Sequence, residues 1–322
     1  MQKRKLGNSG LQVAPLCLGG NVFGWTADEA TSFRILDAFV DAGFGFIDTA
    51  DVYSRWATGN QGGESETILG NWLKRTCNRS KVVIATKVGS EMAASKGLSK
   101  SYILRAAEDS LKRLQTVYID LYQSHVDDPC TPIDETLEAY AQLIKEGKVR
   151  AIGASNFTAE RLTQSLRTSQ ERGLPRYESL QPNYNLCDRS VYELHLESIC
   201  LRQHLGVIPY FSLASGFLTG KYRSEADLAK SPRGTRAQAY FNERGFRILG
   251  ALDYVAREYN ATPACVALAW LQARPGITAP IASATSVEQL QDLVESTRLQ
   301  LDPASIEMLD SASAYSTAAT AA

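Results

Sequence analysis

Four polar residues with side chains suited to proton transfer lie in or directly after short apolar runs: Asp48, Tyr53, Lys87 and His125. A tyrosine ionises near pH ~10 and donates protons poorly at neutral pH unless a neighbouring cation stabilises its phenolate. Lys87 would supply that cation with an attraction of roughly 4 kcal/mol at about 4 Å, which would lower the pKa of Tyr53. Asp48 would keep the lysine protonated, and His125 could donate a hydrogen bond to a substrate oxygen. The set predicts general acid catalysis by Tyr53.

Each of these residues also has an ordinary structural explanation. Asp48 could cap a strand end, Lys87 could be a solvated terminus, and Tyr53 and His125 could be core residues. A purely structural role for all four residues would require four coincidences at the ends of neighbouring runs, so the functional interpretation is favoured. An unprotonated Lys87 could instead form an imine, so a Schiff-base lyase remains an alternative.

Eight short apolar runs alternate with helical patterns along the chain, at residues 16–20, 44–48, 82–87, 118–125, 149–156, 178–184, 207–213 and 277–283. This alternation is typical of an α/β fold of the (β/α)8 TIM-barrel type, in which active sites form at the carboxyl ends of the strands. A chain of 322 residues is long enough for one such barrel, so a single domain over residues 1–322 is expected.

Further segments complete this prediction. Residues 3–6 and 11–15 flank a turn-rich centre, which predicts an N-terminal β-hairpin that plugs one end of the barrel. The polar, arginine-rich residues 221–245 predict a lid loop over the mouth, followed by helices at 248–259 and 263–273. Thr26 is expected to cap the first helix, and the tail from Ser311 is expected to be loose.

Composition restricts the partners. The net charge of −1 argues against sequence-independent binding to nucleic acid or an anionic membrane. No apolar run approaches the roughly 18 residues of a membrane span, and no signal-peptide pattern is present, so a cytoplasmic location is expected. The six cysteines form neither a CxxC pair nor a cluster, which predicts no disulfide framework and no metal site. No GxGxxG follows a strand, so a Rossmann domain is not indicated.

Several motifs follow one another along nearly the whole chain: Gly43-x4-Asp48-Thr49-Ala50-x2-Tyr53, Thr86-Lys87, Asp120-Leu121-Tyr122 before His125, Gly153-x-Ser155-Asn156, Gln181-Pro182-x-Tyr184-Asn185, and Leu213-Ala214-x-Gly216-x-Leu218-x-Gly220-Lys221-Tyr222. In these motifs the sequence resembles the aldo-keto reductase family. The resemblance implies a (β/α)8 barrel that binds NADPH across its mouth and reversibly reduces aldehyde or ketone carbonyls to alcohols. It also implies that Tyr53 is the general acid, that Lys87 and Asp48 tune it, and that His125 orients the carbonyl.

The same resemblance implies a cofactor site. The group that would hydrogen-bond the nicotinamide carboxamide consists of Ser155, Asn156 and Gln181, and Tyr210 would lie under the ring. Residues 211–221 resemble the pyrophosphate loop, with Phe211-Ser212 where Ser-Pro is commonest. Residues 283–286 lack the lysine or arginine that many relatives place near the 2′-phosphate, so Arg233 or Arg236 is expected to supply that charge, with NADPH preferred and NADH possible. The residues expected to bind the cofactor are Gly19, Gly20, Asn21, Asp48, Ser155, Asn156, Gln181, Tyr210, Phe211, Ser212, Leu213, Ser215, Gly216, Lys221, Arg233, Ser283, Thr285, Gln289 and Asp292.

Substrate and oligomeric state cannot be derived from the sequence, because small aldehydes, sugars, inositols and ketones all suit the same four residues. The mouth loops contain Asn21, Trp25, Trp56 and Tyr240, which are candidates for substrate contact, whereas Trp72, Trp270, Tyr102 and Phe246 are expected in the core. A second function, of another class, is a cofactor-binding regulatory subunit that reports redox state with little turnover. Channel-associated relatives of that kind replace the histidine, and this chain keeps His125.

Overall fold

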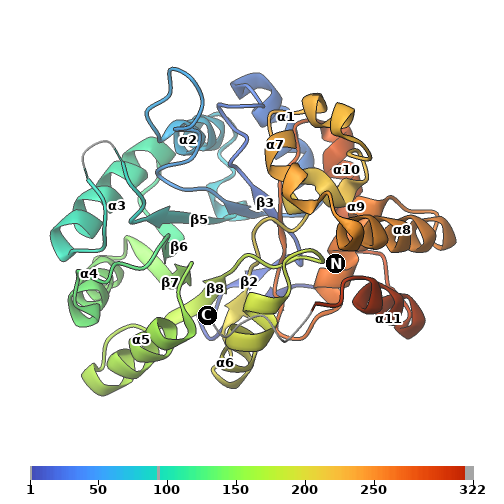
Figure 1. The fold of residues 1–322 in the computed structure, drawn as a ribbon. Coiled ribbons are helices and arrows are strands. Elements are labelled where there is room, and N and C mark those ends of the chain that lie inside the picture. The colour runs from blue at the N-terminus through green and yellow to red at the C-terminus, as the bar shows by residue number, and fades with distance from the viewer. Residues whose placement is uncertain (1, 93–94, 316–322) are drawn as a thin grey trace.

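The computed structural model describes residues 2–92 and 95–315. Eight parallel strands form one sheet in the order β10-β3-β4-β5-β6-β7-β8-β9, and helices surround it as an outer ring (Figure 1). Val207 in the last strand of this order bridges Ile277, and the N–H of Ile281 donates to the carbonyl of Pro209 at 2.9 Å, so the two edges of the sheet meet. The strands are β3 (Cys17–Gly19), β4 (Phe46–Asp48), β5 (Val83–Val88), β6 (Ile119–Ser124), β7 (Val149–Ser155), β8 (Tyr177–Gln181), β9 (Gly206–Val207) and β10 (Ile281–Ala282). The predicted TIM-barrel fold is confirmed.

The helices of the outer ring begin at capping residues that are visible in the sequence. Thr262, Ser286 and Asp302 each accept a hydrogen bond from the backbone three positions onward, as N-caps do. Thr26 is not the first cap; Asp28 accepts from the N–H of Thr31 instead, because the helix begins later than expected. The helices are α1 (Glu29–Asp41), α2 (Glu64–Thr76), α3 (Lys100–Leu114), α4 (Ile133–Lys145), α5 (Ala159–Arg172), α6 (Glu197–Arg202), α7 (Gly234–Ala237), α8 (Glu243–Glu258), α9 (Pro263–Ala273), α10 (Val287–Glu295) and α11 (Pro303–Ala312).

A small apolar core fills the inside of the barrel, separate from the larger core between strands and helices. Phe46, Ala85 and Leu121 belong to the inner core, whereas Ile47 faces the helices. Side chains alternate between the two faces of a strand, so the residue two positions after each inner-core residue also points inward. These next positions are Asp48, Lys87 and Gln123, all buried. The barrel therefore carries a polar layer directly above an apolar one.

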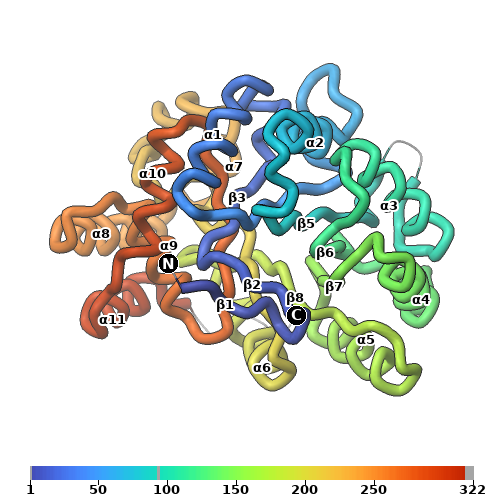
Figure 2. Tube along the Cα trace, turned by 180° about the vertical axis from the view of Figure 1, so that it is seen from behind, coloured from blue at the N-terminus to red at the C-terminus, as the bar shows by residue number. Residues whose placement is uncertain are grey.

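The N-terminal hairpin covers one end of this inner core. Strand β1 (Arg4–Lys5) pairs with β2 (Gln12–Val13) in antiparallel register. Figure 2 shows the hairpin lying across the strands of the barrel. Leu6 and Val13 are fully or almost fully buried and belong to the inner core, so the hairpin is the plug that the sequence predicts.

Three expectations about individual elements need correction. β9 and β10 are much shorter than the predicted runs, because Pro209 and Pro280 lack the N–H that a sheet ladder requires. Phe246 is 41% exposed and packs beside Phe241 rather than in the core. The first residues of the expected loose tail belong to α11, which ends at Ala312, and residues 316–322 lie outside the described chain.

The predicted lid contains short helical turns, at Glu225–Lys230, at α7 and at Gln238–Tyr240. Within the described ranges, no helix is long and apolar enough to cross a membrane.

Candidate active site

Asp48, Tyr53 and Lys87 form one hydrogen-bonded cluster at the carboxyl ends of β4 and β5. The ammonium of Lys87 donates to Asp48 Oδ2 at 2.7 Å, to Tyr53 Oη at 2.7 Å and to the carbonyl of Thr49 at 2.8 Å. The phenol of Tyr53 donates to the same Asp48 oxygen at 3.0 Å. An ammonium has three donors, so all of them are occupied. The lysine and the carboxylate are almost completely buried, which strengthens their attraction.

The electrostatics of this cluster differ from the sequence-based expectation in one respect. Burial raises the pKa of Tyr53 well above its ordinary value of 10, and the charge of Asp48 raises it further. Burial also lowers the pKa of Lys87, although Asp48 opposes this effect. The expected lowering of the pKa of Tyr53 by Lys87 is therefore wrong, because burial of the phenol raises this pKa most and the adjacent Asp48 carboxylate adds to the rise. Tyr53 keeps its proton at neutral pH, as a general acid must.

His125 lies beside this cluster, directly after β6. Its ring centroid is 5.9 Å from that of Tyr53, with an angle of 72° between the ring planes. Burial, together with the charge of Lys87, lowers the pKa of His125 well below its ordinary value of 6.5, so the imidazole is neutral at pH 7. Its Nδ1 is buried without a hydrogen-bond partner in residues 2–92 and 95–315. An unpaired acceptor costs less than an unpaired N–H, which favours placing the proton on Nε2, where it can be donated into the cavity.

Two glutamines, Gln181 and Gln123, donate hydrogen bonds to the other carboxylate oxygen of Asp48. The sequence predicted a site role for Gln181 but not for Gln123. Gln181 Nε2 donates to Asp48 Oδ1 at 2.9 Å and to Gln123 Oε1 at 3.2 Å, and Gln123 Nε2 donates to Asp48 Oδ1 at 3.3 Å. Gln123 is the register partner of Lys87 on β6, and a side chain at Gly153 on the next strand would crowd it, with a Cβ only 3.1 Å from Gln123 Cγ. Gln123 could have been found from the alternation of side chains along β6. Because Leu121 points into the barrel, the residue two positions later also points inward.

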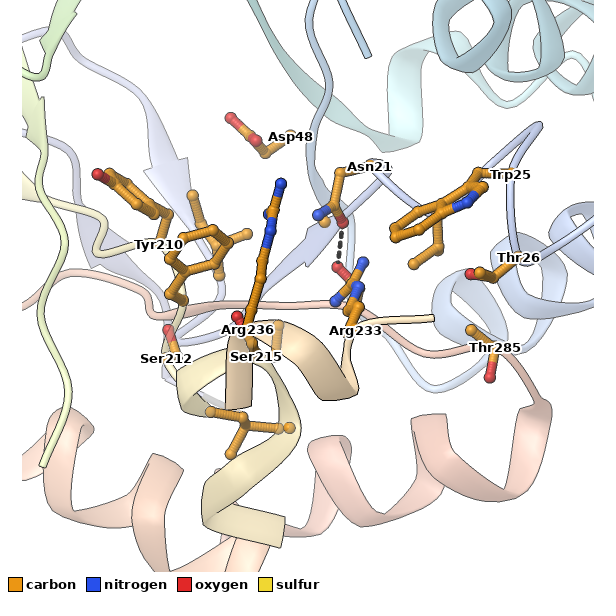
Figure 3. A pocket seen from close by; sticks show the side chains of 18 of the residues that line it. Asn21, Trp25, Thr26, Asp48, Tyr210, Ser212, Ser215, Arg233, Arg236 and Thr285 are labelled. Carbon is orange, nitrogen blue, oxygen red and sulfur yellow. Dashed lines mark hydrogen bonds between the residues drawn. The ribbon is translucent and has the colours of Figure 1, made fainter. Parts of the chain in front are cut away.

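Asp48, Tyr53 and His125 open into one large cavity of about 950 Å³. Figure 3 shows side chains from the barrel strands and from the lid reaching into it. Gly20 does not line the cavity; its N–H donates to the carbonyl of Asp48 at 2.7 Å and its own carbonyl accepts from Ser65 Oγ, so it serves the scaffold. The other residues expected to bind the cofactor all line the cavity: Gly19, Asn21, Asp48, Ser155, Asn156, Gln181, Tyr210, Phe211, Ser212, Leu213, Ser215, Gly216, Lys221, Arg233, Ser283, Thr285, Gln289 and Asp292.

At the end of the cavity near His125, hydrogen bonds fix the residues expected around the nicotinamide. Ser155 Oγ donates to the carbonyl of Gln181 at 2.9 Å, and Asn156 Nδ2 donates to the carbonyl of His125 at 2.8 Å. Tyr210 Oη donates to Asn156 Oδ1 at 2.8 Å. Five residues, from the carboxyl ends of β6, β7 and β8 and from the segment after β9, are thereby held in one arrangement.

The segment after β9 has an unusual backbone. Phe211, Ala214, Ser215 and Gly216 all have positive φ, between 47° and 95°. Such conformations cost energy in residues other than glycine and concentrate at functional sites. Left-handed residues within a turn direct backbone N–H groups toward a shared concavity, which suits an anion.

The lid brings two cations to the same cavity. Arg233 and Arg236 extend from α7 and the residue before it into the pocket, Arg233 toward Trp25 and Arg236 toward Phe211 (Figure 3). Arg233 Nη2 is buried and has no hydrogen-bond partner among the residues that the structure describes. Burial lowers the pKa of Arg233, and the like charge of Arg236 adds to this effect. A guanidinium in this situation has capacity for a bound anion.

The far end of the cavity lacks a cation from the loop after β10. Thr285 donates from its N–H and its Oγ1 to Gln289 Oε1, at 2.9 and 3.1 Å, and Ser283 Oγ donates to Asn21 Oδ1 at 2.6 Å. Asp292 lines the same cavity. The loop after β10 therefore brings no cation to the cavity, whereas the lid brings Arg233 and Arg236.

The mouth differs in two places from what the sequence predicts. Tyr240 does not line the cavity, because its Oη donates to Asp188 Oδ2 at 2.7 Å. Arg55 and Glu91, which the sequence analysis did not single out, line the mouth and form an ion pair at 3.7 Å. They come from the loops after β4 and β5. The lengths and polarity of these loops do not show which of their residues line the mouth.

Comparison with known proteins identifies the family. The model of the "Aldo/keto reductase family" matches residues 15–314. The chain is 38% identical over 320 residues to "Uncharacterized oxidoreductase YrpG" of Bacillus subtilis, which covers 96% of this chain and 95% of the relative. It is 32% identical over 310 residues to "Aldo-keto reductase YhdN" of the same organism, with 92% of this chain and 89% of the relative covered. It is also 32% identical over 301 residues to "Probable voltage-gated potassium channel subunit beta" of Arabidopsis thaliana, with 91% of this chain and 90% of the relative covered. The chain therefore belongs to the aldo/keto reductase family of oxidoreductases.

Proposed function

We propose that the protein reduces aldehyde or ketone carbonyls to alcohols with NADPH, reversibly, and that Tyr53 is the general acid. One observation carries this proposal: the phenol of Tyr53 borders the cavity and accepts a 2.7 Å hydrogen bond from the buried ammonium of Lys87. A phenol so placed can donate its proton to an oxygen in the cavity while the ammonium stabilises the oxyanion that remains.

The cavity suits a dinucleotide. It joins the polar group around Asn156 and Gln181 to the far end at Thr285. The guanidinium of Arg233 lies along the same cavity, and its Nη2 has no hydrogen-bond partner in the described part of the chain. Gln181 has both N–H donors occupied by Asp48 and Gln123, so its Oε1 is the atom left to accept from a carboxamide. The residues from Phe211 to Gly216 would face the pyrophosphate. When bound, the reduced nicotinamide supplies the hydride that goes to the carbonyl carbon.

The residues of the chain have separate tasks in this reaction. Tyr53 turns its O–H from Asp48 to the substrate oxygen and releases the proton as that oxygen gains charge. Lys87 keeps its hydrogen bond to the Tyr53 oxygen throughout, and Asp48 balances the buried ammonium. His125, neutral, donates from Nε2 to the same substrate oxygen and thereby fixes its position. In alcohol oxidation each proton moves in the opposite direction.

NADPH is the favoured cofactor because the lid supplies arginines where the loop after β10 supplies none. Arg233 and Arg236 are the groups able to bind a phosphate with two parallel hydrogen bonds. Asp292, a carboxylate in the same cavity, would suit the hydroxyls of NADH better, so both cofactors are to be compared in one assay.

The arrangement of Lys87 disfavours the Schiff-base alternative. Its nitrogen is fully buried and its three donors are bound to Asp48, Thr49 and Tyr53, so a substrate carbonyl cannot reach it without breaking that cluster. The similarity to a probable voltage-gated potassium channel subunit beta is compatible with the regulatory alternative. The presence of His125 beside Tyr53 favours turnover over that role.

The test is a panel of aldehydes and ketones assayed with NADPH and with NADH, following loss of the reduced-nicotinamide absorbance. The proposal expects cofactor oxidation that requires both enzyme and carbonyl compound, and equimolar alcohol. Tight cofactor binding with no carbonyl reduced across the panel would support the regulatory role instead. Reductive trapping of a carbonyl compound on Lys87 would support the lyase.

A further inference from the structure

Two tryptophans form a corner at the mouth of the cavity. The ring centroids of Trp25 and Trp56 are 5.7 Å apart and their planes are nearly perpendicular, at 85°. Both line the cavity, Trp25 from the loop after β3 and Trp56 from the loop after β4. From this corner we propose that the substrate is an aryl carbonyl compound, with its aromatic ring seated in the corner against both indoles; this inference rests on the proposed reductase function.

The corner is continuous with the catalytic group. The ring centroid of Trp56 is 6.0 Å from that of Tyr53, at 60°, and Tyr53 in turn lies 5.9 Å from His125. A ring held against Trp56 therefore has its neighbouring atoms beside the Tyr53 hydroxyl. A carbonyl attached to that ring directly, or through one methylene, falls within the reach of Tyr53 and His125.

The exposure of these indoles has no explanation in the fold itself. Trp72 and Trp270 are completely buried in the outer core, whereas Trp56 is 46% exposed. An indole held partly in water at a cavity mouth is the kind of surface that a flat apolar ligand covers with a gain in free energy. Perpendicular planes also let one ligand ring stack on one indole while its edge meets the face of the other, which are the two geometries that aromatic pairs prefer.

Charge around the corner distinguishes an aromatic ligand from a cationic one. Tryptophan faces also bind ammonium groups. The guanidinium of Arg233 already lies 5.3 Å from the ring centroid of Trp25, and Arg236 reaches into the same cavity. The nearby Arg55 is paired with Glu91 at 3.7 Å, so that carboxylate is not free for a second cation. Because Arg233 already lies against Trp25 and Glu91 is already paired, a neutral or anionic ring suits this corner better than a second cation.

The experiment compares phenylacetaldehyde with cyclohexylacetaldehyde, in which the methylene isolates the carbonyl from the ring, so intrinsic reactivity is similar. The saturated ring is the more hydrophobic of the two, so a cavity that is merely apolar would prefer it. With saturating reduced cofactor, we expect the wild-type enzyme to have a kcat/KM about two- to tenfold higher for phenylacetaldehyde, the range that an aromatic contact contributes. Trp56→Ala should bring the ratio to about 1, and Trp56→Phe should keep most of it.

The matched control is Tyr254→Ala, which removes another exposed aromatic side chain, on α8 and away from the cavity, and should leave the ratio unchanged. A second readout does not need turnover: the dissociation constants of 2-phenylethanol and 2-cyclohexylethanol from the enzyme with oxidised cofactor, with the same preference expected. Equal values for the two ring types, unchanged by Trp56→Ala, would overturn the aromatic site while leaving the reductase function intact. If neither aldehyde is reduced but the alcohols show the preference, the site stands and the proposed reaction fails.

Discussion

The ammonium nitrogen of Lys87 lies 2.7 Å from the phenol oxygen of Tyr53, although 34 positions separate the two residues in the chain. Strand β4 and its loop provide the tyrosine, and β5 provides the lysine. Because β4 and β5 are paired neighbours with Asp48 opposite Ala85, two positions before Lys87, the barrel itself determines this distance. This contact, together with the Asp48 carboxylate oxygen that accepts from both groups, holds the cluster in place.

Removing the buried ammonium should damage both activity and stability. In Lys87→Met, Asp48 is left as a buried charge without its partner, which typically costs about 3–5 kcal/mol. Urea unfolding should show this loss, and carbonyl reduction should fall by about 100-fold or more. The double variant Lys87→Met/Asp48→Asn should recover part of the stability but not the activity. Lys148→Met, which removes a partly exposed lysine with two acidic neighbours, is the matched control and should unfold almost as the wild type does. Equal stability of both single variants would contradict the buried pairing.

Gln123 should affect cofactor binding although it does not line the cavity. In Gln123→Leu, the amide of Gln181 loses one of its two acceptors and keeps only Asp48, so its Oε1 is held less firmly for the nicotinamide carboxamide. We expect the dissociation constant of the oxidised cofactor to rise by about tenfold, as lost supporting hydrogen bonds commonly produce at binding sites. Fluorescence titration measures it. Gln170→Leu, at an exposed glutamine of α5, should leave it unchanged, and an unchanged constant in Gln123→Leu would show that Gln181 is oriented by other groups.

Asp51 should make stability depend on pH in an unusual direction. This carboxyl is 2% exposed, and burial, followed by the charge of Glu66, raises its pKa to about 8, although Arg113 and Lys87 oppose the shift. An unfolded aspartate ionises near pH ~4, so between about pH 4 and 8 the folded state holds one proton more than the unfolded state. The contribution of Asp51 to stability is therefore greatest at low pH and is lost as the pH rises through this window.

Replacement by asparagine, which is neutral at every pH, removes that loss. Asp51→Asn should raise the free energy of unfolding at pH 7 by on the order of 2–4 kcal/mol, and by much less at pH 4.5. Urea unfolding at the two pH values measures both. An equal change at both values would mean that Asp51 is ionised in the folded protein at pH 7.

Much of the site was predictable because strand ends can be recognised locally. Asp48, Lys87 and His125 each terminate an apolar run, and parallel strands of a barrel bring such ends to one face. The helix predicted over residues 263–273 has those bounds in the structure, because proline suits the first helical position and Thr262 before it is the N-cap.

The remainder depended on contacts between distant segments. Gln123 acts on Asp48 across 75 positions, and nothing within its own strand reveals that partner. The pKa of Tyr53 was misjudged because the sequence suggests that Lys87 lies near it, but shows neither how deeply the phenol is buried nor that one Asp48 oxygen is hydrogen-bonded to both groups. Tyr240 was assigned to the mouth by its loop, yet its hydroxyl is bound to Asp188.

The most direct test of the central claim is the steady-state rate of carbonyl reduction by Tyr53→Phe, measured with the cofactor affinity of the same variant. The phenylalanine keeps the ring beside His125 and Trp56 and removes only the hydroxyl that Lys87 contacts. The account predicts a rate at least about 100-fold below that of the wild type, with cofactor affinity nearly unchanged. A variant that kept more than about a tenth of the wild-type rate would contradict the assignment of Tyr53 as the proton donor.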